Sequence, residues 1–291
     1  YEITYGDWSS DVCSSDLTIQ VLTATVAMWQ ANTAVVGLIQ PDKWQASHRL
    51  LRSIGLLKND VSLPDAYDVI TTGSFTLEAW IYRDSTADKQ AVIGTFNWWM
   101  GNNSGWLLQL KSDGQIALAG ANGVWNASYG IYNSSGYILT SSLTCSLNDW
   151  THVALTRDGS DTLKVFINGE EAGSTTYAYS LNREAGSGGN VKELKVGSFL
   201  VDNSAVTSYG MGNYFSGYID DLRITQGVAR YTANFTPSTS QLKLAGDAYA
   251  ANVALLMNME GTHGSTTFTD SSNNAYAVTA VGDTKLSTFK F

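Results

Sequence analysis

The stretch from Trp150 to Pro237 constrains the fold of this chain more than any other. Its successive blocks, among them HVALTRDG, LKVFINGE, ELKVGSF and YIDDLRIT, alternate apolar and polar residues and are separated by Gly, Asn or Asp. A period of two is typical of half-buried antiparallel strands, because successive side chains point to opposite faces of a sheet. The stretch therefore predicts an all-β fold of antiparallel strands, whereas a parallel α/β fold would need long periodic helices.

Composition agrees with strands and turns and argues against nucleic acid as a partner. The chain has 291 residues, of which 44% are hydrophobic and 15% charged, and its formal net charge is −9. Nucleic-acid binding needs a basic face that displaces counterions, which such an acidic chain does not suggest. No apolar run reaches about eighteen residues, so no membrane insertion is predicted. The two cysteines, Cys13 and Cys145, are too few for a disulfide framework.

The order of these strands resembles one family. Residues 219–237 read IDDLRITQGVARYTANFTP, and an FTLEAW strand precedes them at residues 75–80. Together with the blocks quoted above, they resemble the laminin-G-like branch of the concanavalin A-like lectin and glucanase superfamily. The motif resembles the form common in phage virion and bacterial surface proteins. The resemblance implies an antiparallel β-sandwich of two sheets, a jelly roll, that mostly binds rather than catalyses.

The domain organisation has one clear unit and two uncertain ends. The laminin-G-like sandwich is expected over residues 55–245. Residues 1–54 are an uncertain segment, because residues 7–17, DWSSDVCSSDL, match the translation of a common sequencing adapter and are excluded from fold reasoning as an artefact of a metagenomic assembly. Residues 246–291 resemble the first strands of a further repeat; alternatively, they complete the same sandwich.

Catalysis is not predicted, although the superfamily includes glucanases. Retaining glucanases of this group carry an E-x-D-x-x-E strand that sets two carboxylates close together, and no such triplet occurs here. The acidic pairs Glu170-Glu171 and Asp220-Asp221 are adjacent in sequence, so their side chains should point to opposite faces of a strand. A divergent glycoside hydrolase or polysaccharide lyase remains as a lesser alternative.

Two charged residues are expected to pair within one sheet. Glu78 lies in the FTLEAW strand and Arg223 in the DDLRI strand, at positions where the family usually has Glu and Arg. We interpret them as a structural ion pair that fixes the register of the two strands, rather than as ligand-binding groups. If the pair is buried, removing one partner should be costly.

The resemblance also implies a calcium ion near the rim of the sandwich. Calcium takes six to eight oxygen ligands. Asp220 or Asp221 would supply carboxylate oxygens, and Asp270 would assist if the C-terminal segment folds back on the sandwich. Alternatively, these aspartates only satisfy backbone donors at strand ends.

Aromatic residues among Asn and Gly are the candidates for ligand binding. Sugars stack their C–H faces on aromatic rings while polar groups take the hydroxyls. On that basis we select Trp99, Trp106, Trp125 and Tyr129. The alternative is that these rings pack in the core, where large aromatic residues usually lie.

The sequence thus predicts a non-catalytic carbohydrate-binding or adhesion module on a virion or cell surface. Its partners would be glycans or surface polysaccharide, bound weakly and in many copies, and repeats offer a route to self-association. The alternative is a purely structural spacer of a phage fibre or decoration protein.

Overall fold

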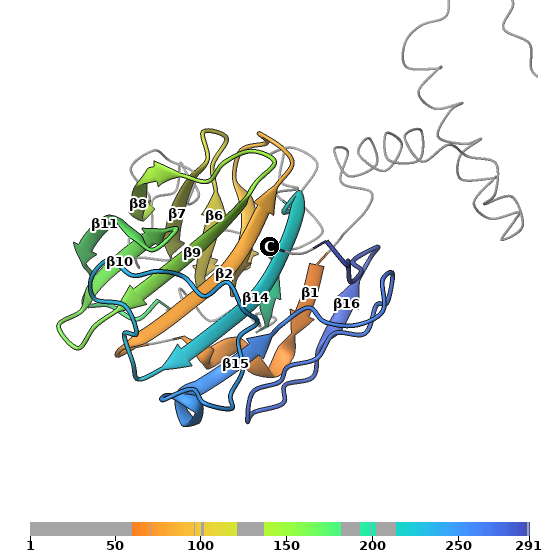
Figure 1. Cartoon of the computed structure of the whole chain (residues 1–291). Helices are drawn as coiled ribbons and strands as arrows, with labels where there is room; N and C mark the ends of the chain where they lie inside the picture. Colours follow the sequence, from red (N-terminus) through yellow and green to blue (C-terminus); the bar gives the residue numbers. More distant parts are fainter. Residues whose placement is uncertain are drawn as a thin grey trace, which may run out of the picture. The chain divides into compact units, whose positions relative to one another are not determined.

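Two antiparallel sheets form the main layers of the fold (Figure 1), as the sequence predicts. The computed structural model describes residues 60–70, 72–95, 97–99, 102–120, 137–181, 193–198, 200–201, 214–289 and 291. All of them fall within one compact unit, Arg52–Phe291. None of the helices in these residues is long and apolar enough to cross a membrane.

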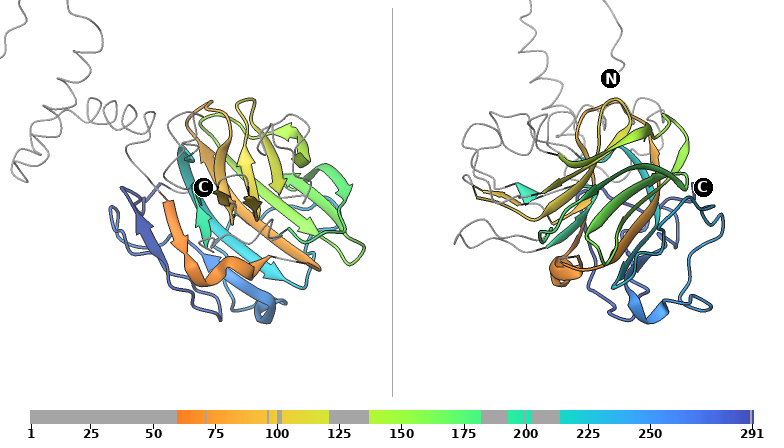
Figure 2. Two further views of the ribbon diagram at one scale, coloured as in Figure 1. Left: turned by 180° about the vertical axis from the view of Figure 1, so that it is seen from behind. Right: turned by 90° about the vertical axis from the view of Figure 1, so that its left-hand side faces the viewer.

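The larger sheet runs in the order β16-β1-β12-β3-β6-β7-β8. It is the nearer layer when the molecule is turned by 180° (Figure 2, left). Its strands are β1 (Asp60–Leu63), β3 (Gln90–Gly94), β6 (Trp106–Leu110), β7 (Gln115–Gly120), β8 (Tyr137–Thr144), β12 (Leu194–Val196) and β16 (Thr279–Val281).

The smaller of the two main sheets runs in the order β11-β10-β9-β2-β14-β15 and faces the viewer in Figure 1. Its strands are β2 (Phe75–Arg83), β9 (Trp150–Arg157), β10 (Thr162–Ile167), β11 (Glu170–Thr176), β14 (Gly217–Gln226) and β15 (Val253–Met257). The remaining elements are a small sheet of β4 (Asn97–Trp99), β5 (Asn102–Ser104) and β13 (Leu200–Val201), and the 3-10 helices η1 (Pro64–Val69) and η3 (Ala250–Asn252).

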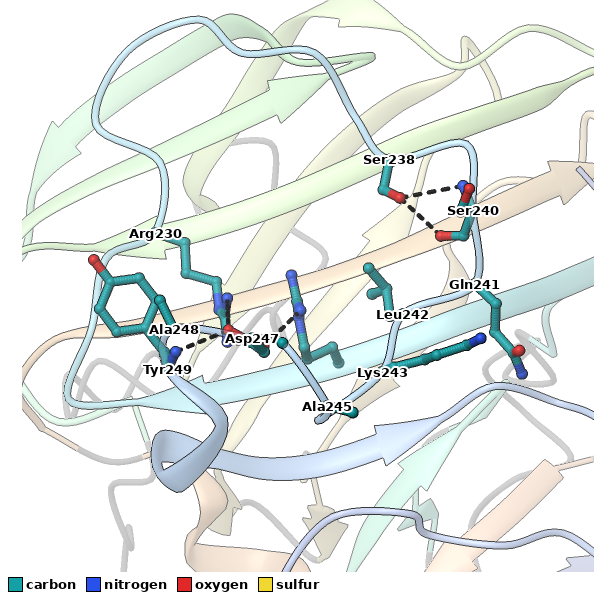
Figure 3. Close-up of a pocket in the computed structure, with 12 residues that line it drawn as sticks. Arg230, Ser238, Ser240, Gln241, Leu242, Lys243, Ala245, Asp247, Ala248 and Tyr249 are labelled. Carbon is teal, nitrogen blue, oxygen red and sulfur yellow. Dashed lines mark hydrogen bonds and ion pairs between the residues drawn. The ribbon is translucent and has the colours of Figure 1, made fainter.

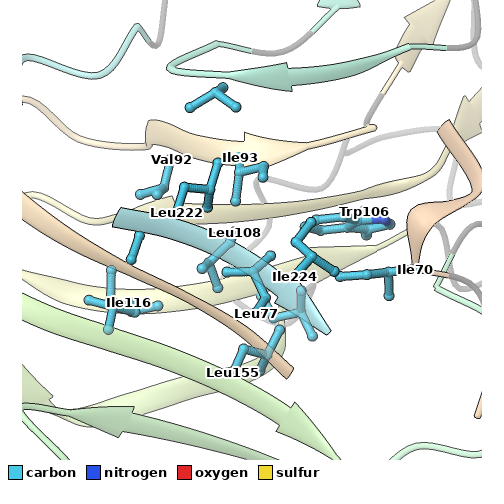
Figure 4. Packing of buried hydrophobic residues seen from close by; sticks show 14 of the residues in the cluster. Ile70, Leu77, Val92, Ile93, Trp106, Leu108, Ile116, Leu155, Leu222 and Ile224 are labelled. Atoms are coloured by element: carbon cyan, nitrogen blue, oxygen red, sulfur yellow. The ribbon is translucent and has the colours of Figure 1, made fainter. Parts of the chain in front are cut away.

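The core lies between the two main sheets. Along β2 the inward row, Phe75, Leu77, Ala79 and Ile81, is at most 2% exposed. Figure 4 shows Leu77 among side chains from both sheets. The alternation that predicted the strand therefore also sets which face meets the core, and removing this apolar row from water is the main stabilising contribution.

The C-terminal segment supplies strands that pair with strands of the sandwich. Strand β15 pairs with β14, with Leu256 opposite Arg223, and β16 pairs with β1. One strand thus joins each main sheet. The turn between them is fixed by Asp270, whose carboxylate accepts hydrogen bonds from the backbone N–H groups of Leu256, Ser272 and Tyr276 at 2.9–3.0 Å.

The outer face of the β2 sheet is partly covered by residues 227–249, which we call the covering loop. It leaves β14 at Gly227 and returns to the sheet at η3 and β15. Residues Thr76 and Glu78 of β2 point away from the core but are only 0% and 1% exposed. Thr76 Oγ1 donates to the carbonyl of Val228 and accepts from the N–H of Arg230. The loop therefore makes a second buried layer, and this layer is polar.

Candidate functional site

The centre of the polar layer is the ion pair between Glu78 and Arg223. The two residues lie directly opposite each other on β2 and β14. Arg223 donates to Glu78 Oε1 from Nε at 2.9 Å and from Nη2 at 2.7 Å. The pair expected from the sequence is therefore present, and it is buried. Its effect on stability remains a prediction.

The second oxygen of Glu78 is also occupied. Tyr231 of the covering loop donates its hydroxyl to Oε2 at 2.7 Å, and His152 Nε2 of β9 lies 3.4 Å from the same atom. Burial alone would raise the pKa of the Glu78 carboxyl, but the hydrogen bond from His152, the charge of Arg223 and the hydrogen bond from Tyr231 outweigh it. The pKa is lowered to about 2. Glu78 is thus a fixed carboxylate at neutral pH.

A second carboxylate, Asp247, joins two arginines at the edge of the layer. Arg223 Nη1 lies 3.0 Å from Asp247 Oδ2, and Arg230 binds both oxygens, at 3.0 Å from Nη1 and 2.7 Å from Nη2. Arg230 also donates from Nε to Thr225 Oγ1 at 2.6 Å. Burial would raise the pKa of Asp247, but the hydrogen bonds and charges of the arginines hold it below its usual value. Two carboxylates and two guanidinium groups therefore form one network.

This network forms one wall of a hollow in the surface, with a volume of about 570 Å³. The hollow is lined by Arg223, Arg230 and covering-loop residues between Ser238 and Tyr249. In Figure 3, Tyr249, Arg230 and Asp247 lie on one side and Ser238 on the other. The Tyr249 ring is 42% exposed, and the Arg230 guanidinium lies 5.1 Å from its centroid. Fixed polar groups beside an exposed ring suit a polar ligand with some apolar surface.

Of the four aromatic residues selected from the sequence, the structure describes the side chain of Trp106 alone. Trp106 is 0% exposed and belongs to the core cluster, so the prediction that it contacts a ligand is wrong. Gly105, with φ +82°, makes the turn that directs the chain into β6, and the indole then falls on the inward row. Trp125, Tyr129 and the Trp99 side chain lie outside the described residues, so those three predictions stand as they were.

The three aspartates selected for calcium do not fit a shared cation shell. Asp220 accepts a hydrogen bond from the N–H of Asp221, whose own carboxylate binds Asn258 Nδ2 at 2.7 Å and the Leu242 N–H at 2.9 Å. Both oxygens of Asp270 bind backbone N–H groups. Among the described residues, no group of three or more His, Cys, Asp or Glu is placed to hold a metal. Calcium binding stays a prediction, which calorimetric titration of chelator-treated protein would check.

Sequence reasoning missed Arg230, Asp247 and Tyr249. Arg230 is part of the motif that carries the resemblance, but it lies in a loop, where no strand period indicates its partner. Asp247 and Tyr249 lie beyond the motif, in a stretch of small and polar residues. Only the opposite strand positions of Glu78 and Arg223 gave a usable signal.

Comparisons with known proteins agree with this fold. A family model described as the concanavalin A-like lectin/glucanases superfamily matches residues 57–230. A search of the curated proteins finds no match. Among solved structures, a Bacteroides ovatus protein proposed to bind carbohydrate is similar, with 17% identity and a TM-score of 0.51 over 79% of this chain. The chain spans 60% of the length of that protein, and at this identity the likeness shows the fold alone.

Two further structures are similar more loosely. The CBM40 of the Ruminococcus gnavus IT-sialidase has 17% identity and a TM-score of 0.40, covering 57% of this chain and 84% of its own. The heptameric SAP-like pentraxin of Limulus polyphemus has 12% identity and a TM-score of 0.36, covering 80% and 92%.

Proposed function

Because the chain belongs to the concanavalin A-like lectin/glucanases superfamily, we propose that it is a non-catalytic carbohydrate-binding module. It serves adhesion on a phage virion or bacterial surface, and weak single contacts gain strength from display in many copies. The observation on which this proposal depends is the hollow beside Arg230, Asp247 and Tyr249.

The chemistry of the hollow suits a sugar. Hydroxyl groups need polar partners held in fixed positions, and the carboxylate of Asp247 fixes the guanidinium group of Arg230, a hydrogen-bond donor, at the wall of the hollow. Ser238 and Gln241 add neutral polar groups at the rim. Tyr249 adds a ring on which the C–H face of a pyranose can stack. The hollow is open, which suits weak and reversible binding.

The ionisation of the network supports a binding role rather than hydrolysis. A glycosidase of this type needs a general acid whose pKa is raised toward neutrality. The pKa of Glu78 is lowered to about 2, and that of Asp247 is also lowered. Both carboxylates also bind arginines directly. Neither is suited to donate a proton to a leaving group at neutral pH.

A glycan array tests the proposal with two tyrosine variants. Tyr249→Ala removes the exposed ring of the hollow, whereas the control, Tyr179→Ala, removes a ring that is 60% exposed and does not line the hollow. Loss of one stacking contact should weaken glycan binding about tenfold. The Tyr179 variant should bind like the parent.

Two results would contradict the proposal. Binding that is insensitive to Tyr249→Ala would move the site away from the hollow. A folded protein that binds no glycan at all would favour the structural spacer.

A further inference from the structure

A second group of rings lies on the same sheet face, outside the hollow. Trp80 and Tyr82 of β2, Trp150 of β9 and Tyr218 of β14 form this group, which we call the aromatic patch. Tyr82 lies opposite Trp150 on one side and Tyr218 on the other. The ring centroids are 5.7 Å and 5.8 Å apart. Neighbouring strands therefore place a row of rings on the outer face, and none of them carries a charge at neutral pH.

The patch is covered by two phenylalanines from the last residues of the sequence. Phe291 stacks on Trp80 with centroids 4.7 Å apart and planes 9° apart, and its edge faces Trp150 at 6.1 Å. Phe289 lies 4.9 Å from both Tyr82 and Tyr218. A flat six-membered ring thus already fits between the plane of Trp80 and the side of Trp150.

Ring contacts, rather than hydrogen bonds across a strand ladder, hold this cover. Leu286 is buried and exchanges two backbone hydrogen bonds with Gly264 and Ser265. Beyond it, the described residues show only the rings and a local hydrogen bond from the Phe289 N–H to Ser287 Oγ. Phe289 remains 43% exposed. The segment after Leu286 can therefore leave the patch without breaking a strand.

The covered patch also leaves one polar group unpaired. The indole Nε1 of Trp150 is buried and has no hydrogen-bond partner in the described part of the chain. A buried indole N–H normally finds an acceptor. The phenylalanine rings supply none, whereas a hydroxyl group on a bound ring would. The occupant that suits the patch best therefore has an apolar face and hydroxyl groups at its edge.

We propose that the aromatic patch is a binding site for a neutral pyranose, which replaces Phe291 on the plane of Trp80. The inference rests on the proposed function for its ligand class but assigns a separate site. β-Linked glucose is the simplest match, because its equatorial hydroxyls leave both ring faces apolar. An uncharged sugar is preferred, since the patch has no charged ring and the chain carries a net charge of −9. Trp80 Nε1 donates to the carbonyl of Ser238, which lines the hollow, so the two sites adjoin.

Calorimetric titration with cellohexaose tests this site. The double variant Phe289→Ser/Phe291→Ser uncovers the patch. This variant should bind cellohexaose about tenfold more tightly than the parent protein does. Adding Trp80→Ala to the double variant should abolish this gain in affinity. Adding Tyr179→Ala should leave the gain unchanged, because Tyr179 lies outside the patch. Circular dichroism establishes that each variant is folded before the affinities are compared.

Three outcomes would overturn the assignment. The double variant could bind no better than the parent, or the gain could survive Trp80→Ala. The double variant could also form dimers, detected by solution scattering, which would make the patch a protein interface. If one of these outcomes is found but Tyr249→Ala still weakens glycan binding on the array, the proposed function stands and only the site at the aromatic patch fails. If no folded variant binds any glycan, both fail.

Discussion

Glu78 is the residue whose surroundings are most fully specified. It is 1% exposed, and both oxygens have partners from other strands or from the covering loop. Breaking a buried pair from one side leaves the other charge uncompensated, which usually costs about 3–5 kcal/mol. The network should therefore be more important for stability than an ion pair in contact with water.

Replacing Glu78 with Gln tests that expectation. The change keeps the shape but removes the buried charge that Arg223 Nε and Nη2 bind, so the free energy of unfolding should fall by about 3–5 kcal/mol. The control is Asp113→Asn, which breaks the more exposed pair with Lys111 and should cost no more than about 1 kcal/mol. Urea denaturation measures both. Equal, small effects would show that the buried pair does not stabilise the fold.

The same carboxylate predicts an acid transition. Its pKa is about 2 in the folded protein, below the ordinary value of 4.5. A group with a lowered folded pKa stabilises the protein above its unfolded pKa, and this contribution is lost as pH falls from about 4.5 to about 2. Stability measured across this range should decline steeply in the parent and less in Glu78→Gln. Parallel curves for the two proteins would contradict the assignment.

At this scale the sequence predicts pairs on strands better than residues in loops. Glu78 and Arg223 could be paired because strand alternation and the family pattern place them on one face. Trp106 was misread because its Asn- and Gly-rich flank suggested a loop, whereas the turn at Gly105 starts a strand and points the indole inward. Asp247 could not be found, because only the path of the loop brings it to Arg223.

Among the elements, the covering loop is the least predictable and the most important for the site. The alternation of apolar and polar residues predicts the strands β2, β9, β10 and β14. The loop has no period, and its path is set by contacts made far away in sequence. One such contact is at the β10–β11 hairpin, where the Phe235 N–H donates to the carbonyl of Gly169 at 2.9 Å.

A glycine substitution tests this contact. Gly169 has φ +80°, and a Cβ there would lie 1.9 Å from the Phe235 carbonyl oxygen. Gly246 has φ +84° but open space around it. Alanine is strained at both positions, so Gly169→Ala should be more destabilising than Gly246→Ala by about 1–3 kcal/mol, the range expected for overpacking. Thermal unfolding compares them. Similar losses of stability in the two variants would mean that the covering loop does not contact the hairpin closely at Gly169.

At the scale of the whole molecule, the described residues form one sandwich. Strand pairing between distant segments decides this, and pairing partners cannot be read from local periodicity. For that reason the sequence left two alternatives for residues 246–291, and it did not indicate the pairing of β15 with β14 or of β16 with β1. The family resemblance, by contrast, was enough to predict the two-sheet architecture.

Hydrogen exchange checks that the C-terminal strands belong to the sandwich in solution. Amides of β15 that donate to β14 should be protected as strongly as those of β14, because the two strands share a ladder and a core. If residues 246–291 instead behaved as part of a separate repeat, β15 would open at a lower free energy than β14.

The most direct test of the central claim is hydrogen-exchange footprinting with a glycan selected on the array. If the chain binds sugars through the outer face of the β2 sheet, added glycan should slow exchange within residues 238–249 and leave β6 and β7 unchanged. Slowed exchange confined to the β6–β7 side, or no change at a saturating glycan concentration, would contradict the claim.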